Sequence, residues 1–340
     1  MCTRLAVLWA FSATLGFCGD WNPKLAADYL DSRQKAWIEW PNALRNGITC
    51  TSCHTNLMYL LSRPALESKL RDASPYKEKL LGNLRLGLSR RTPEDSPSVG
   101  TESILAALLL VSEDSRHGTL SKDTEEAFAR LWALQIESGK YKGSWHWFSQ
   151  DLDPWEEPES AYFGAALAAL AVGTAPAEYR ARPELRANLE ALKSYLDTAH
   201  AGQPLHNRLM LLWASAKWRD LLPESERKAI AAEAISKQRD DGGWSIQSLG
   251  PWKEHPKALP AEGSSAYATA VAAFTLQQGA IAKSDAAVRH ALEWLRSHQD
   301  TSAGYWDAVS MNKRYEAGSM MEQFMRDAAT GFAVLALLAQ

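Results

Sequence analysis

Short segments made almost entirely of apolar and small residues recur along the chain. Each begins with a polar residue able to cap a helix and then continues apolar on nearly every side. A helix that is apolar all round is predicted to be buried all round, and its Ala and Gly residues allow close packing. The segments are 101–111, 159–171, 206–214, 264–276 and 326–338.

Amphipathic segments alternate with these apolar ones, for example residues 183–199 and 284–298. Each has one apolar face, so we expect it to lie outside the buried helices. The buried helices are predicted to start at Glu102, Glu159, His206, Ser264 and Asp327.

These starts lie at a nearly regular spacing, and one further step back along the chain reaches His54. A sixth buried helix is therefore predicted to begin there, with residues 26–40 as its outer partner. Six outer–inner pairs predict an all-α fold, an (α/α)6 toroid in which all the inner helices start at one end.

A Gln, a Gly and a Trp recur in that order where several outer helices end. Repetition at such a period is typical of a repeat architecture. We expect each Trp to pack at the turn and its indole NH to bond a helix-end carbonyl. The segments are ALQIESGKYKGSWHW (133–147), SKQRDDGGWS (236–245) and WLRSHQDTSAGYWD (294–307).

The N-terminus is typical of an export signal. Arg4 precedes the apolar stretch 5–17, which is too short to span a bilayer as a helix. We therefore predict a signal peptide over residues 1–19, a lipid anchor at Cys18 being an alternative, and one toroid domain over 20–340. The mature protein is expected to be periplasmic or extracellular, with no transmembrane segment. A net charge of −3 gives no electrostatic basis for binding nucleic acid.

The motif CTSCH occupies residues 50–54. Two Cys three apart followed by His is the pattern for covalent haem attachment. A thioredoxin-like redox pair needs a βαβ context that the chain does not show, and a structural disulfide closing so short a loop stabilises little. We therefore predict one haem c, with thioethers to Cys50 and Cys53 and with His54 as an axial ligand to the iron.

The second axial ligand is expected from the loops that gather at the start of the inner helices. Met325 is the preferred candidate because it lies just before the start predicted at Asp327. Core packing is the alternative role for any one Met. The other candidates are His146, His206, His255 and Met320.

The Gln–Gly–Trp segments resemble the QW repeats of squalene–hopene cyclases and the related prenyltransferase superfamily, over roughly residues 120 to 340. QRDDGGW (238–244) matches best. The resemblance implies an α/α toroid. The stretch from WNPKLAADYLDSRQ through CTSCHT to YLLSRPAL also resembles a bacterial group of exported squalene-cyclase-repeat proteins with an N-terminal CxxCH.

The chain departs from the cyclases at the catalytic acid. Their DxDD motif has one near match, DLDP at 151–154, in which Pro154 replaces the last Asp. Four carboxylates near the predicted starts of inner helices are the candidates for a substitute acid. They are Asp153, Glu157, Glu159 and Asp327.

Three functions follow from these patterns. The first is electron transfer or haem-dependent redox chemistry with a redox partner. The second is a binding or scaffold protein whose cavity holds an apolar small molecule or a glycan. The third is a cyclase-like enzyme, an analogy that rests on the fold.

Overall fold

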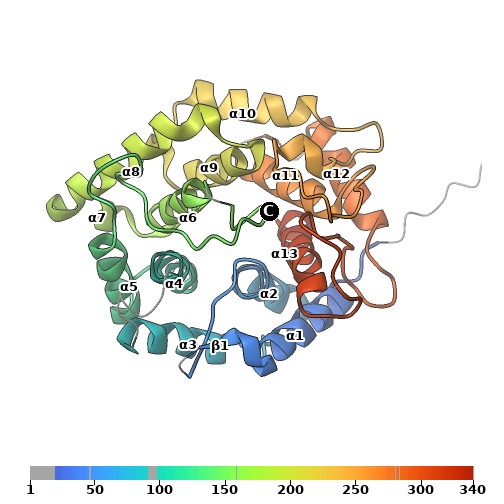
Figure 1. The fold of residues 1–340 in the computed structure, drawn as a ribbon, viewed down its shortest axis with the longest axis horizontal. Coiled ribbons are helices and arrows are strands. Elements are labelled where there is room, and N and C mark those ends of the chain that lie inside the picture. The colour runs from blue at the N-terminus through green and yellow to red at the C-terminus, as the bar shows by residue number, and fades with distance from the viewer. Residues whose placement is uncertain are drawn as a thin grey trace, which may run out of the picture.

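The computed structural model describes residues 20–45, 47–90, 98–157, 159–279, 281–282 and 284–339. The predicted signal peptide, Cys18 and the segment 91–97 lie outside these ranges. Six inner helices form a closed ring (Figure 1). Each packs against the next in chain order, and the last packs against the first. They are α2 (Asn56–Leu70), α4 (Val99–Asp114), α6 (Ala161–Thr174), α9 (Leu205–Lys217), α11 (Ala266–Gln278) and α13 (Phe324–Leu338).

Six outer helices surround this ring, and each precedes its inner partner in the chain (Figure 1). The predicted (α/α)6 toroid is therefore confirmed. The outer helices are α1 (Pro23–Glu39), α3 (Lys77–Arg90), α5 (Lys122–Ala133), α8 (Arg186–Ala199), α10 (Glu224–Ser236) and α12 (Ala286–Ser297).

Shorter elements lie in the connections. A two-stranded antiparallel hairpin, β1 (Leu44–Arg45) and β2 (Ile48–Thr49), follows α1, and the four-residue helix α7 (Ala177–Arg180) precedes α8. The remaining elements are 3-10 turns. They are η1 (Pro41–Ala43), η3 (Pro183–Leu185), η4 (His200–Gly202), η5 (Arg219–Leu221), η6 (Ile246–Leu249) and η7 (Met321–Gln323).

The inner helices are buried on every side, as their composition predicts. In α6 every residue from Ala161 to Gly173 is buried. Small residues permit this crowding, because a Cβ on Gly164 would lie 2.2 Å from the ring of Trp147. The outer helix α12, in contrast, buries one face only, with Val288, Ala291 and Leu295 among its buried residues.

The predicted starts of the inner helices are confirmed to within three residues, and contacts between them place them at one end of the ring. Thr55, just before α2, donates a hydrogen bond of 2.7 Å to Asp327 of α13. His206 of α9 lies 2.8 Å from the hydroxyl of Tyr267 in α11. Trp155, which precedes α6, donates to that same hydroxyl.

The Gln–Gly–Trp turns join neighbouring outer helices. Each Trp is buried and donates its indole NH to a carbonyl of the preceding outer helix, at Leu131, Ala234 and Leu295. Each Gln donates both to the Gly carbonyl of its own turn and to a carbonyl of the next outer helix or its cap. Those second acceptors are Asn188, Ala287 and Asn22.

The last of these turns closes the ring on the beginning of the chain. Gln299 accepts from the backbone NH of Asn22 at 2.6 Å and donates to its carbonyl at 3.0 Å. Gly304 has a φ of +81°, and a Cβ there would lie 2.3 Å from the carbonyl carbon of Leu25. Only Gly therefore fits at this position, where the turn meets α1.

Candidate functional site

A pocket opens at the end of the ring where the inner helices start. We call it the aromatic pocket, and its volume is about 260 Å³. It is lined by CTSCH, by the loop 147–156 and by residues from the segment 310–325. Its aromatic lining residues are Trp37, Trp40, Trp147, Phe148, Trp155, Tyr315 and Phe324.

The CTSCH segment is held by the end of α1 and by the start of α2. Trp37 donates its indole NH to the carbonyl of Cys50 at 2.9 Å, and the Cys50 NH donates to Ala43. Asn56 accepts from the Ser52 NH at 2.8 Å. Cys50 and Cys53 both line the pocket and are not joined by a disulfide.

His54 is enclosed by aromatic rings and is 7% exposed. Its imidazole stacks on Phe324 with 3.7 Å between ring centroids, and Trp37 meets it edge-on. Its Nδ1 lies 2.8 Å from the hydroxyl of Thr55. Burial, aided by the charge of Arg33, lowers the pKa of His54 to about 3, so the ring is neutral at ordinary pH.

The acidic run 153–159 divides between the pocket and the surface. Asp153 and Glu156 line the pocket, whereas Glu159 is exposed and pairs with Lys140 at 2.8 Å. Burial raises the pKa of Glu156 to about 7. Burial together with the nearby carboxylates Asp153 and Glu159 raises that of Glu157 to about 7 as well, although Glu157 does not line the pocket.

Sequence reasoning missed Glu156. Asp153, Glu157 and Glu159 were the candidates in this run, and nothing in its spacing indicates that Glu156 lines the pocket while Glu157 and Glu159 do not. The backbone determines which side chains face the pocket, because Leu152 and Glu156 pair as an isolated β-bridge that turns the segment back on itself. Asp153 is oriented by His255, whose Nε2 lies 3.0 Å from Oδ2, while Oδ1 is buried and accepts no hydrogen bond from the described residues.

The contacts of Asp327 indicate that it holds helices together. It is 1% exposed and accepts hydrogen bonds from Tyr29 and Arg33 of α1 and from Thr55 next to α2. It therefore ties the last inner helix to the first pair, and it lines neither of the two pockets described here.

The proposed distal ligands are scattered. Met325 lines the aromatic pocket together with His54, and His255 lies beyond Asp153 in a neighbouring pocket. His206 is fully buried between Tyr267 and Asn207, and burial lowers its pKa to about 4. The Met320 sulfur accepts from Arg33, and the side chain of His146 is exposed.

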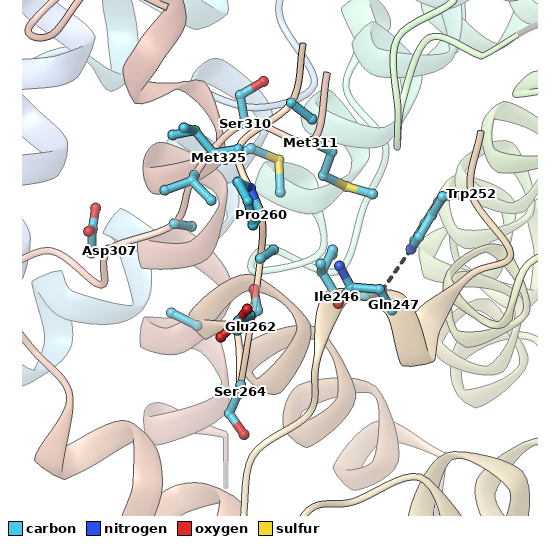
Figure 2. Close-up of a pocket in the computed structure, with 18 of the residues that line it drawn as sticks. Ile246, Gln247, Trp252, Pro260, Glu262, Ser264, Asp307, Ser310, Met311 and Met325 are labelled. Carbon is cyan, nitrogen blue, oxygen red and sulfur yellow. Dashed lines mark hydrogen bonds between the residues drawn. The ribbon is translucent and has the colours of Figure 1, made fainter. Parts of the chain in front are cut away.

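A larger cavity adjoins the aromatic pocket. We call it the outer pocket, and its volume is about 650 Å³. Figure 2 shows Ser310, Met311 and Met325 together on one side, with Trp252 donating its indole NH to the Ile246 carbonyl on another. Ser310 and Met325 line both pockets.

Comparison with known proteins shows the fold. No family model matches the sequence, and no curated protein matches it. Among solved structures, the GH76A α-1,6-mannanase from Salegentibacter sp. HEL1_6 is similar at a TM-score of 0.55 and 12% identity, covering 93% of this chain and 100% of that one.

Two further solved structures share the architecture. A polysaccharide lyase gives a TM-score of 0.58 at 12% identity, covering 93% of this chain and 96% of that one. A possible member of the GH105 family from Klebsiella pneumoniae subsp. pneumoniae MGH 78578 gives 0.57 at 11%, covering 98% of each. At such identities the likeness establishes an α/α toroid, whereas the closer resemblance to squalene–hopene cyclases stays a prediction.

These comparisons correct the functional prediction from CTSCH. Electron transfer or haem-dependent redox chemistry is wrong as the main interpretation, because the whole-length structural neighbours include an α-1,6-mannanase and a polysaccharide lyase. The surroundings of His54 agree with the correction, since its ring is packed between aromatic side chains as part of the pocket wall. Within the described ranges, no group of three or more His, Cys, Asp and Glu side chains could hold a metal ion.

Covalent haem attachment is a separate matter from electron transfer, and it stays a prediction. Cys50, Cys53 and His54 lie together on one pocket, which fits the donor set that attachment requires. A covalently bound haem would stay with the polypeptide through acid–acetone extraction and give a pyridine-haemochrome spectrum. Protein exported from a host with the attachment machinery, and colourless after extraction, would exclude it.

Export from the cytoplasm also stays a prediction, since the signal segment lies outside the described residues. Within those residues, no helix combines the length and the hydrophobicity needed to cross a bilayer.

Proposed function

We propose that the protein binds an oligosaccharide in the aromatic pocket, as an exported glycan-binding toroid. The observation that carries the proposal is the combination of aromatic rings and carboxylates on one concave surface. The C–H-bearing face of a sugar ring is apolar and packs on an aromatic face, while its hydroxyls donate to carboxylate oxygens. A mostly apolar pocket with a few convergent polar groups is the usual form of a small-ligand site.

Asp153 supplies an acceptor for such a ligand. Its Oδ1 is buried at the pocket without a hydrogen-bond partner among the described residues, and leaving such an atom unpaired costs free energy. The atom has almost no accessible surface, so a sugar hydroxyl would reach it only after the surrounding side chains shift. The fold gives further support by analogy, since a variant of the mannanase, similar to this chain at a TM-score of 0.53 and 12% identity, was solved in complex with α-1,6-mannotriose.

The test is binding of neutral oligosaccharides by isothermal titration calorimetry, with α-1,6-mannotriose as the first probe. Trp40→Ala removes a half-buried ring from the pocket and should weaken binding at least tenfold. The matched control is Trp132→Ala, which removes a half-buried ring from the outer helix α5 and should leave binding unchanged. Failure of a panel of neutral and acidic oligosaccharides to bind at millimolar concentration would refute the proposal.

A second candidate function is cleavage of the bound glycan, and Glu156 favours it. A carboxyl with a pKa of about 7 keeps a proton near neutral pH and can donate it to a glycosidic oxygen, with Asp153 as the second carboxyl in the same pocket. Glu156→Gln should abolish release of reducing ends while oligosaccharide binding persists. Equal release by the variant and the unmodified protein would exclude Glu156 as the acid.

A further inference from the structure

The outer pocket and the aromatic pocket share part of their lining. Ser310 and Met325 line both, and the His255–Asp153 contact joins a residue of the outer pocket to one of the aromatic pocket. Both pockets are bordered by the segment that precedes α13, and the outer pocket is completed by the loop 246–266 between α10 and α11. The two cavities are therefore consecutive parts of one cleft.

The two volumes differ in what they can hold. The aromatic pocket, at about 260 Å³, falls just below the range of about 300–1,000 Å³ that is usual for ligand sites. The outer pocket, at about 650 Å³, lies well inside that range. A ligand confined to the aromatic pocket would be short, whereas one that continued past Ser310 would fill the larger cavity too.

The surface of the outer pocket suits further sugar units. Trp252 presents a half-buried ring there, and Leu259 and Val309 expose apolar side chains. Glu254 and Glu262 are exposed at the same cavity and offer acceptors to hydroxyl groups.

The charges along the cleft are mostly acidic. Lys253 and Arg45 are the Lys and Arg side chains that line it, and Lys253 is already paired with Asp151. A glycan that carried carboxylate or sulfate groups would meet repulsion from the acidic side chains. Those are Glu102, Asp153, Glu254 and Glu262, whereas Asp307 also lines the cleft but pairs with Arg326 at 2.8 Å.

We infer that the two pockets form one extended binding cleft for a neutral glycan chain of several sugar units. This inference rests on the function proposed above and specifies its substrate class. The inner end of the chain would lie in the aromatic pocket, and the units beyond it would lie between Trp252 and Met311 in the outer pocket (Figure 2).

The experiment compares chain length and charge on the full chain. Dissociation constants are measured for α-1,6-linked mannose oligomers of two to six units and for oligogalacturonates of matched length. We expect the hexamer of mannose to bind at least tenfold more tightly than the trimer, and the acidic oligomers to bind at least tenfold more weakly, with that deficit shrinking as salt is added.

Two variants test which part of the cleft causes the preference for longer chains and the preference for neutral ones. Ala258 lines the outer pocket, so Ala258→Trp places a large ring in that pocket and should reduce the gain with length, while trimer binding stays within twofold. Glu254→Lys combined with Glu262→Lys changes two exposed residues, which protects the fold, and should improve binding of the acidic oligomers. Glu224→Lys combined with Glu226→Lys makes the same charge change at exposed positions of α10. This control should leave the affinity for the acidic oligomers unchanged.

The outcomes separate the inference from the function on which it rests. Equal affinity for trimer and hexamer, unaffected by Ala258→Trp, would overturn the extended cleft and leave the proposed function intact. Acidic oligomers that bind as well as neutral ones would overturn the neutral substrate class. Absence of binding by every oligomer would remove the proposed function itself.

Discussion

The turn after α12 and the loop after α1 occupy equivalent places in the repeat but have different roles. After α12 the chain places Gln299, Gly304 and Trp306, and the side chains of Gln299 and Trp306 donate to backbone carbonyls of Asn22, Gly304 and Leu295. After α1 it places a hairpin and CTSCH, whose Cys50 and Cys53 line a pocket. Where the repeat is kept, its residues hold helices together; after α1, where it is replaced, side chains line a pocket instead.

The largest expected effect comes from removing a Trp of a repeat turn. Trp306 is fully buried and bonds the carbonyl of Leu295, so Trp306→Ala should lower the free energy of unfolding by about 3–5 kcal/mol. Trp40→Ala, at the pocket, should cost less than about 1 kcal/mol. Urea unfolding followed by circular dichroism measures both. Equal losses would mean that the loop after α1 is as structural as the turn after α12.

The second largest loss of stability is expected on replacing Gln299, which closes the ring. Gln299→Ala leaves the NH of Asn22 and the carbonyl of Gly304 without their partner and removes one of the two donors to the carbonyl of Asn22, at a cost of about 2–3 kcal/mol. The matched control is Gln150→Ala, an exposed Gln at the aromatic pocket, which should change stability by less than about 0.5 kcal/mol. A loss below about 1 kcal/mol for Gln299→Ala would mean that the ring is closed mainly by helix packing.

A third prediction concerns the turn after α8, which has lost the repeat. The connection after α8 lacks the Gln and the Trp, and His206 follows it in the core with a pKa of about 4. The unfolded state, with an ordinary His pKa near 6.5, binds the proton first as pH falls, so stability is present above pH 6.5 and is lost below it.

The loss attributable to His206 should reach about 2 kcal/mol at pH 5 relative to pH 7.5. His206→Gln keeps a hydrogen-bonding side chain beside Tyr267 but cannot titrate, so urea unfolding at the two pH values should show that much less pH dependence. An unchanged dependence would assign the acid sensitivity to other groups, with His54 the first to examine.

The smallest effect is expected at the thiols. Cys50 and Cys53 are only partly buried and are not joined by a disulfide, so replacing both with Ser should change stability by less than about 1 kcal/mol. Thermal unfolding of the double variant, measured beside Trp306→Ala, checks this. A larger loss would place the CTSCH segment among the structural parts of the repeat.

The architecture could be predicted from the sequence because it depends on periodic signals. Apolar helices of small residues, spaced at one repeat, place the inner ring, and the Gln–Gly–Trp turns mark the ends of three outer helices. Each of these signals is local. Even the closing contact at Asn22 involves a turn whose residues are recognisable without knowledge of their partner.

The site could be predicted only in part because loops assemble it without any period. The sequence indicated which end of the ring carries it, and Cys50, Cys53 and His54 do line the aromatic pocket. It did not indicate that His255 would orient Asp153 from 102 residues away, or that Glu156 would face the pocket while Glu159 faces outward. Those outcomes depend on how three irregular loops pack over the helix ends.

A ring built from a linear chain contains one joint that covalent connectivity does not support. Here that joint lies between the last helix pair and the first, where Gln299 meets Asn22 across 277 residues and Asp327 meets Tyr29, Arg33 and Thr55. Five joints can assemble as soon as adjacent pairs have been synthesised, whereas the sixth waits for the whole chain and carries the largest loop-closure entropy. An open, horseshoe-shaped intermediate is therefore the expected last species before the native state.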